Sequence, residues 1–233
     1  MINKIYSSID EASYDIHDGS SVMIGGFGGI GSPHNLVQAM SGKARELTLI
    51  CGSIGAIMAL KDVSCIKRLI SGYVSTLLAV KEEWARMAKM IDEGEIGVEL
   101  VPFGNFVERI RTGGSGIPAF YTPVGAATIF GKDKETRIFE GRECFLERAL
   151  RADFALIRAH KADRMGNLAY RKTARNYNPI MAMAADVTIV QADEIVEVGE
   201  LEPDCTHTPG IFVDRVVHVE PALTKFARVR KRT

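Results

Sequence analysis

Short apolar runs alternate with amphipathic stretches along most of the chain. The apolar runs predict buried strands, and the stretches with apolar residues three or four positions apart predict helices, the longest at 81–92. Such alternation is typical of an α/β fold with a mainly parallel open sheet and flanking helices. Extended segments lie closer together in the C-terminal part, where we expect some antiparallel strands. The predicted strands are 22–24, 47–51, 66–70, 97–101, 136–139, 154–159, 187–190 and 215–219, and the predicted helices are 33–40, 81–92, 105–111 and 179–184, besides a short capped helix from Ser8 to Ile16 and a Gly-rich loop at 113–125.

Length and composition fit a single globular domain over residues 1–233. Hydrophobic residues make up 46% of the chain and charged residues 25%, which is enough apolar material for a packed core. Lys plus Arg and Asp plus Glu both number 29, and this balance argues against nucleic acid as a main partner. Residues 225–233 are basic and lack a core pattern, so we expect a solvated tail there.

The chain shows no targeting signal and no metal motif. Its N-terminus lacks the apolar stretch of a signal peptide, and no apolar run approaches the length of a membrane span. The four cysteines are scattered without a C-x-x-C pair, which argues against structural zinc and against disulfides. We therefore expect a cytoplasmic protein with no membrane partner and no metal site.

A glycine-rich loop follows the predicted strand 22–24 and precedes Pro33, which opens the next helical pattern. Its sequence is Gly25-Gly26-Phe27-Gly28-Gly29-Ile30-Gly31. Glycines allow the backbone to turn sharply and to approach another molecule closely. A helix that begins just beyond such a loop offers unpaired N–H groups and the positive end of its dipole. The pattern therefore predicts a site for an anionic or phosphorylated group.

A dinucleotide is one candidate guest for this loop. Residues 26–31 satisfy the spacing G-x-G-x-x-G, but the next predicted strand ends in Cys51-Gly52-Ser53, without the acid that would hold a ribose. No Gly-Lys-Ser/Thr follows the loop, so a nucleotide triphosphate is disfavoured as well. A dinucleotide-binding domain and a turn with only a packing role remain as alternatives.

The loop and several later motifs together carry a more specific resemblance. In order and content they are similar to the A (alpha) subunits of family I coenzyme A transferases, in particular those that act on 3-oxoacids such as 3-oxoadipate. The resemblance covers nearly the whole chain and implies a CoA-transferase-like α/β fold. The further matching stretches are 113–123, 150–161, 163–168, 175–179 and 199–211.

The resemblance implies that this chain is one of two subunits that together form the enzyme. Family members move CoA from succinyl-CoA or another acyl-CoA to a 3-oxoacid through a nucleophilic glutamate, which belongs to the B (beta) subunit in a Ser-Glu-Asn-Gly context. That tetrapeptide does not occur in this sequence. We therefore expect no catalytic nucleophile here, a partner beta subunit in a heterodimer or heterotetramer, acyl-CoA and carboxylic acids as substrates, and CoA as a co-substrate without another cofactor.

The resemblance also implies two walls of the active site. The CoA-binding wall is the loop Ile24, Gly25, Gly26, Phe27, Gly28, Gly29, Ile30 and Gly31. The substrate pocket and oxyanion wall comprise Ser53, Phe103, Gly104 and Asn105.

Two stretches of the second wall depart from the family pattern. Phe103 stands where a glutamine is expected to donate to the thioester oxyanion, and a phenyl ring cannot donate. Gly52-Ser53-Ile54-Gly55 replaces an expected Asn-Asn-Ala-Gly. Three interpretations stay open: Asn105 or a backbone N–H supplies the donor, Phe103 lines a pocket for a bulkier and more aromatic substrate, or the reaction is hydrolase-like.

Residues outside these walls have two interpretations each. A group of four basic residues could bind a phosphate of CoA or contact the partner chain, or it could form a solvated face. Tyr177 could anchor an interface or pack in the core. His160 lies at the end of a predicted strand, where it could meet a ligand or be an ordinary loop histidine. The basic group consists of Arg164, Arg171, Lys172 and Arg175.

Overall fold

The computed structural model describes residues 2–74 and 82–220. Residue 81, where the longest predicted helix begins, and the predicted basic tail 225–233 lie outside these ranges. Within them, no helix is both long enough and apolar enough to cross a bilayer.

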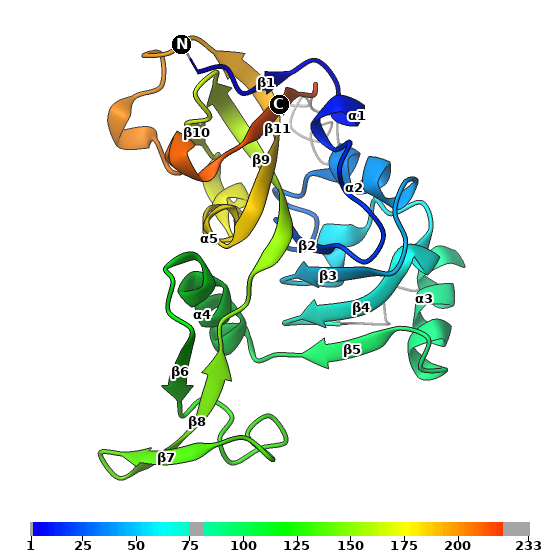
Figure 1. The fold of residues 1–233 in the computed structure, drawn as a ribbon, viewed down its shortest axis with the longest axis vertical. Helices are drawn as coiled ribbons and strands as arrows, with labels where there is room; N and C mark the ends of the chain where they lie inside the picture. The colour runs from blue at the N-terminus through cyan, green and yellow to red at the C-terminus, as the bar shows by residue number, and fades with distance from the viewer. Residues whose placement is uncertain (1, 75–81, 221–233) are drawn as a thin grey trace, which may run out of the picture.

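The main sheet is open and mostly parallel (Figure 1), which confirms the predicted fold class. Its strands follow the order β1-β12-β11-β9-β2-β3-β4-β5, and every neighbouring pair along this path is parallel. The short strand β10 pairs with β9 in the antiparallel sense. The bounds are β1 Ile5–Tyr6, β2 Ser21–Ile24, β3 Leu47–Cys51, β4 Ile66–Ser71, β5 Gly97–Leu100, β9 Ala152–Asp163, β10 Leu168–Ala169, β11 Ala185–Val196 and β12 Arg215–His218.

A second, antiparallel sheet extends away from the main sheet, at the bottom of Figure 1. It has the order β6-β8-β7, with bounds β6 Ala119–Thr122, β7 Thr136–Phe139 and β8 Arg142–Arg148. These antiparallel strands lie near the middle of the chain, whereas the antiparallel pair β9–β10 lies in the later part, where we expected antiparallel strands. The sequence interpretation placed β6 inside a loop and missed β8, because charged residues at both ends of β8 hide its alternation.

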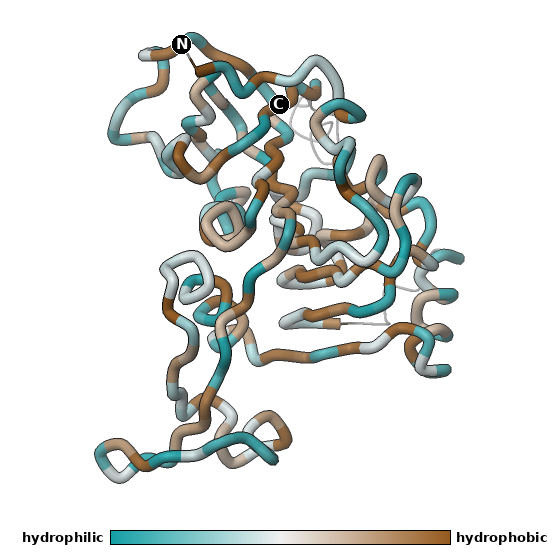
Figure 2. Tube along the Cα trace, viewed as in Figure 1, coloured by the Kyte–Doolittle hydropathy of each residue, from teal (hydrophilic) through white to brown (hydrophobic). Residues whose placement is uncertain are grey.

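Helices cover both faces of the main sheet. On one face, α2 His34–Ser41 and α3 Glu82–Asp92 bury Leu36, Val37 and Trp84 in one apolar cluster. On the other, α4 Phe103–Gly114 and α5 Asn178–Met183 bury Phe106 and Met181 in a second cluster. Figure 2 shows apolar residues along the central strands between these layers. The predicted short helix at the N-terminus, α1 Ile9–Ala12, is capped by Ser8, whose hydroxyl accepts from the Glu11 amide, and it ends before Ile16.

The strand order creates one switch point. From β2 the chain steps outward through β3, β4 and β5, and it then returns to β9, which pairs with β2 on the other side. From β9 it continues outward in the opposite direction through β11 and β12. In open α/β sheets, ligands bind beyond the carboxyl ends of the strands at such a point. The glycine-rich loop begins there, directly after β2.

Candidate active site

The tip of the glycine-rich loop is a tight two-residue turn. Phe27 and Ile30 exchange both backbone hydrogen bonds, at N···O distances of 3.0 and 2.9 Å. Gly28 and Gly29 lie between them with φ of +57° and +85°, the left-handed values that such a turn requires and that glycine adopts most readily. The turn therefore holds the side chains of Phe27 and Ile30 outward, 42% and 56% exposed.

Two asparagines near the start of α5 fix the loop in place. The Asn176 Oδ1 accepts from the Gly26 amide at 3.1 Å, and the Asn176 Nδ2 donates to the Ile30 carbonyl at 2.9 Å. The Asn178 Nδ2 donates to the Gly31 carbonyl at 3.1 Å. Because both ends of the turn are bonded to one rigid segment, the loop is formed before any ligand arrives.

The segment after β3 supports the same turn from the other side. The Ser53 hydroxyl oxygen accepts from the Gly28 amide at 3.1 Å, and Ser53 is only 4% exposed. The sequence interpretation placed Ser53 in the substrate wall. In the structure its hydroxyl bonds to the glycine turn, so Ser53 supports the turn and does not line the pocket itself.

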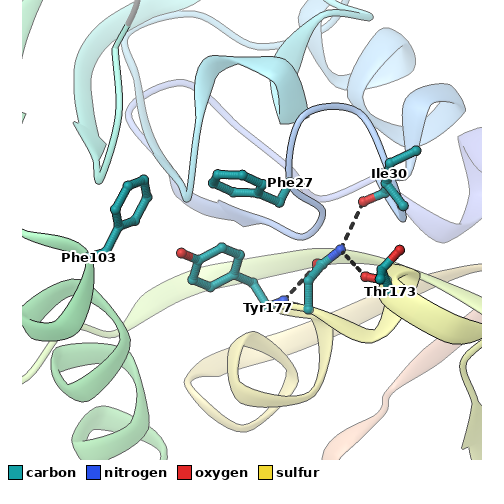
Figure 3. A pocket seen from close by; sticks show the side chains of 6 residues that line it. Phe27, Ile30, Phe103, Thr173 and Tyr177 are labelled. Atoms are coloured by element: carbon teal, nitrogen blue, oxygen red, sulfur yellow. Dashed lines mark hydrogen bonds between the residues drawn. The ribbon is translucent and has the colours of Figure 1, made fainter.

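A pocket of about 410 Å³ opens between the glycine turn, the start of α4 and the segment before α5 (Figure 3). Aromatic rings form much of its lining. The ring of Phe27 lies 5.8 Å from the ring of Phe103 and 6.1 Å from the ring of Tyr177, measured between centroids. Within the described part of the chain, no charged side chain lines this pocket. The lining residues are Phe27, Ile30, Phe103, Thr173, Asn176 and Tyr177.

The structure brings only some of the predicted site residues to this pocket. Phe27, Ile30 and Phe103 line it, and Gly28 and Gly29 form the turn beside it. The remaining residues of the predicted CoA-binding wall, Ile24, Gly25, Gly26 and Gly31, are buried beneath the turn and do not line the pocket.

Asn105 does not reach the pocket either. It is 1% exposed, its Nδ2 donates to the Val124 carbonyl at 3.0 Å, and its Oδ1 accepts from the Thr122 hydroxyl at 3.3 Å. Its amide is thus committed to the junction between α4 and the small antiparallel sheet. Gly104 is exposed in the first turn of α4, where an added Cβ would meet nothing within 4 Å.

Tyr177 is the lining residue whose role the sequence left undecided. It is half-buried, and its ring packs edge-on against Phe106 at 5.7 Å. Burial raises the pKa of the Tyr177 phenol, and the neighbouring Cys51 thiol adds to this effect. Asn176 and Thr173 were also missed as lining residues, because only the folded chain brings the segment before α5 against the glycine turn.

The predicted basic group is divided in the structure. Arg171, Lys172 and Arg175 lie on the segment that carries Thr173, and they make no ion pair with another described residue. Arg164 lies apart from them and pairs with Glu197. These three cations are close in sequence to Thr173 and Asn176, two residues that line the pocket, but they do not line it themselves.

His160 belongs to a different group. Its Nδ1 lies 3.6 Å from a carboxylate oxygen of Asp193, and the other oxygen of this carboxylate accepts from Arg158 at 2.8 Å. The structure gives His160 an ion-pair environment outside the lining of the aromatic pocket.

Comparison with known proteins gives this site a family. Residues 6–219 match the family model described as Coenzyme A transferase. The A subunit of the 3-oxoadipate CoA-transferase of Pseudomonas putida is 45% identical over 227 residues, which cover 95% of this chain and 96% of that protein. The A subunit of the probable succinyl-CoA:3-ketoacid coenzyme A transferase of Bacillus subtilis (strain 168) is 43% identical over 240 residues, which cover 100% of this chain and 95% of that protein.

A solved structure shows the same fold. An acyl-CoA transferase from Escherichia coli O157:H7, solved as a thioester complex with CoA, matches with a TM-score of 0.77 at 20% sequence identity. The match covers 94% of this chain and 48% of that one, so this chain spans about half the length of the solved protein.

Together, the switch-point glycine turn and these matches define an enzyme of the transferase class. The chain belongs to the coenzyme A transferase family, which confirms the resemblance inferred from the sequence motifs.

Proposed function

We propose that this chain is the alpha subunit of a heteromeric CoA transferase. The enzyme moves CoA from succinyl-CoA, or another acyl-CoA, to a 3-oxoacid such as 3-oxoadipate. The observation that carries the proposal is the preformed glycine turn, held by Asn176 and Ser53 beside an aromatic pocket at the switch point. The names of the relatives at 45% and 43% identity support the same activity and the same place in a two-part enzyme.

CoA is the co-substrate that this site would hold, and no other cofactor is needed. The thioester end of CoA is apolar enough to lie against the exposed side chains of Phe27 and Ile30. Its phosphates are anionic and suit Arg171, Lys172 and Arg175 on the exposed segment that carries Thr173, since charge-assisted hydrogen bonds to phosphate are among the stronger polar contacts.

The nucleophilic glutamate comes from the beta subunit in this proposal. A carboxylate attacks a thioester well only when it is desolvated and held beside the carbonyl carbon. Three glutamates of this chain are otherwise engaged or exposed. Glu147 lies 3.0 Å from the Lys134 ammonium at the base of the small sheet, Glu108 pairs with Arg111 at 2.9 Å, and Glu143 is exposed on β8.

The chemistry is a two-stage exchange. A carboxylate oxygen of the glutamate adds to the thioester carbonyl carbon. The C–S bond then breaks, which releases the CoA thiolate and forms an acyl anhydride between the acyl group and the glutamate. The thiolate then attacks the glutamyl carbonyl, which releases the first carboxylic acid and leaves CoA on the enzyme as a thioester. The incoming 3-oxoacid repeats these steps in reverse order and leaves as its CoA thioester.

A hydrolase-like reaction is the second candidate. The observation that favours it is Phe103, which occupies the pocket where the family pattern has a donor side chain. In that case water would take the place of the incoming acid, and free CoA would be the product.

Co-expression with the beta-like partner chain tests the proposal. The purified complex is incubated with succinyl-CoA and a panel of 3-oxoacids, and the CoA products are identified by mass spectrometry. We expect transfer to at least one 3-oxoacid, and none by this chain alone. Borohydride reduction should trap the glutamyl-CoA thioester on the partner chain. Release of free CoA without transfer would support the hydrolase.

We place the enzyme in the cytoplasm, as its dispersed free cysteines suggest.

A further inference from the structure

The proposed reaction needs a hydrogen-bond donor, and this chain lacks the donor side chain that the family pattern has at position 103. When a carboxylate adds to a thioester, the carbonyl oxygen becomes an anion, and a donor aimed at this oxygen stabilises the transition state. Phe103 cannot donate, and the Asn105 amide is bonded at the junction with the small sheet. Besides a backbone N–H, the remaining candidate donors are the other polar side chains that line the pocket.

Of the three polar side chains that line the pocket, that of Asn176 is already engaged in hydrogen bonds. The Asn176 Nδ2 donates to the carbonyls of Ile30 and Thr173, both at 2.9 Å, so both of its N–H groups are used. The Thr173 side chain lies beside Ile30, at the end of the pocket away from Phe103 (Figure 3). The Tyr177 ring, in contrast, points its hydroxyl toward the Phe103 side.

The Tyr177 hydroxyl is free to donate. It makes no hydrogen bond to any other residue in the ranges that the structure describes. Burial raises the pKa of this phenol above its ordinary value of 10.0, so the group keeps its proton throughout the physiological range. A neutral phenol is a good donor to an oxyanion.

The Tyr177 ring is also held in one position. A Cβ added at Gly52 would lie 2.3 Å from the ring Cε2, so the ring occupies the space that any side chain at position 52 would need. Phe106 packs edge-on at 5.7 Å on another side, and the Tyr177 amide donates to Asn176 Oδ1 at 2.7 Å. A donor fixed in this way needs no reorganisation when charge develops.

The two departures from the family pattern thus meet at one residue. Gly52 leaves room for the Tyr177 ring, and Phe103 leaves the pocket without a donor of its own on that side. We propose that Tyr177 is a catalytic residue whose hydroxyl donates a hydrogen bond to the thioester oxyanion. This inference rests on the CoA-transfer function proposed above.

The step balances without a co-reactant. As the C–O bond forms, the carbonyl π electrons move to the oxygen, which accepts the hydrogen bond from Tyr177. As the C–S bond breaks, these electrons return to form the new carbonyl, and the thiolate leaves with the electron pair of that bond. The phenol proton stays on Tyr177 throughout.

Steady-state kinetics of Tyr177→Phe in the co-purified complex with the beta subunit tests the inference. This substitution keeps the ring and removes only the hydroxyl. We expect kcat for CoA transfer to fall by roughly 100-fold or more, as for other oxyanion donors, with little change in KM for the acyl-CoA. Tyr170→Phe is the matched control, because that hydroxyl is buried against Thr208 at 2.8 Å and lies outside the pocket lining. Its kcat should stay close to that of the wild type.

A second variant separates chemistry from packing. Phe103→Gln in the Tyr177→Phe background places an amide donor on the same side of the pocket, and we expect it to restore part of the lost kcat. If the wild-type complex transfers CoA and Tyr177→Phe does so equally fast, the inference is wrong and the proposed function stands. If the wild-type complex transfers CoA to no acceptor, the proposed function fails and the inference fails with it.

Discussion

The Ser53 hydroxyl oxygen accepts a hydrogen bond from the Gly28 amide at 3.1 Å, and this contact joins the segment after β3 to the turn after β2. The two residues are 25 positions apart in sequence. Gly28 lies at the exposed tip of the turn, whereas Ser53 is buried beneath it. The shape of the turn therefore depends on a side chain that a ligand in the aromatic pocket need not touch.

Removal of this contact should loosen the turn. We expect Ser53→Ala to lower the free energy of unfolding by about 1 kcal/mol, because one partly buried hydrogen bond is lost. The KM for acyl-CoA should rise by roughly 3- to 10-fold if the free turn samples other conformations. Ser115→Ala, which removes an exposed hydroxyl at the end of α4, is the control. An unchanged KM in Ser53→Ala would show that the turn keeps its shape without Ser53.

Glycine at position 31 should be required for folding of the loop. Gly31 has φ of +74°, and an added Cβ would lie 2.4 Å from the Ala174 carbonyl oxygen. We expect Gly31→Ala to lower the free energy of unfolding by about 2–4 kcal/mol, since backbone must shift to admit the methyl group. Gly104→Ala is the matched control, because its Cβ would meet nothing within 4 Å. Urea denaturation compares the two, and equal stabilities would contradict the close approach at Gly31.

The cations on the segment that carries Thr173 should strengthen CoA binding in a salt-dependent way. Arg171→Ala and Arg175→Ala should each raise the KM for acyl-CoA by roughly 2- to 5-fold at low ionic strength, as expected for exposed charge pairs. The difference from the wild type should shrink as salt is added. Lys67→Ala, which removes an exposed cation paired with Glu46, controls for net charge. A similar KM increase in Lys67→Ala would mean that no specific phosphate contact is made.

An ion pair between the N-terminal segment and β12 should make stability depend on pH. The Arg215 guanidinium donates to both carboxylate oxygens of Asp15, each at 2.6 Å, and this hydrogen bonding lowers the pKa of Asp15 below its ordinary value of 3.8. A lowered folded-state pKa stabilises the protein above pH 3.8, and this stabilisation is lost as the pH falls toward the folded-state value.

Asp15→Asn should therefore be less stable than the wild type at pH 7, and the gap should narrow below about pH 4. Urea denaturation across this range measures the gap. Asp10→Asn is the control, because Asp10 is largely exposed in its pair with Lys43 and should show little effect at any pH. A gap that stays constant down to about pH 3 would show that the loss comes from packing and not from the charge.

The elements that the sequence predicted well are those with a local signal. The alternation of apolar runs and amphipathic stretches indicated the parallel sheet, and the glycine spacing indicated a tight turn after β2. The small sheet was harder to predict, because β8 carries charged residues among its buried ones and pairs with strands on both sides. Its strand character comes from pairing that a local pattern does not show.

The orientation of Asn105 depended on where one helix begins. The sequence suggested a helix from Asn105, which would leave its side chain near the loop after β5. In the structure α4 begins at Phe103, so Asn105 falls within the first helical turn. There its side chain is hydrogen-bonded to Thr122 and Val124, and these contacts come from a segment that follows the helix and that the local pattern does not reveal. The role of Tyr177 was equally hidden, because its contacts with Gly52 and Phe27 join segments far apart in sequence.

Isotope exchange is the most direct test of the central claim, that this chain provides one wall of a CoA-transfer site. The complex with the beta subunit is mixed with unlabelled succinyl-CoA and deuterated succinate, without any 3-oxoacid, and the acyl-CoA pool is followed by mass spectrometry. We predict that label enters succinyl-CoA, because CoA held on the enzyme returns to either succinate, and that Tyr177→Phe slows this exchange. Loss of succinyl-CoA to free CoA with no label in the remaining thioester would contradict the account.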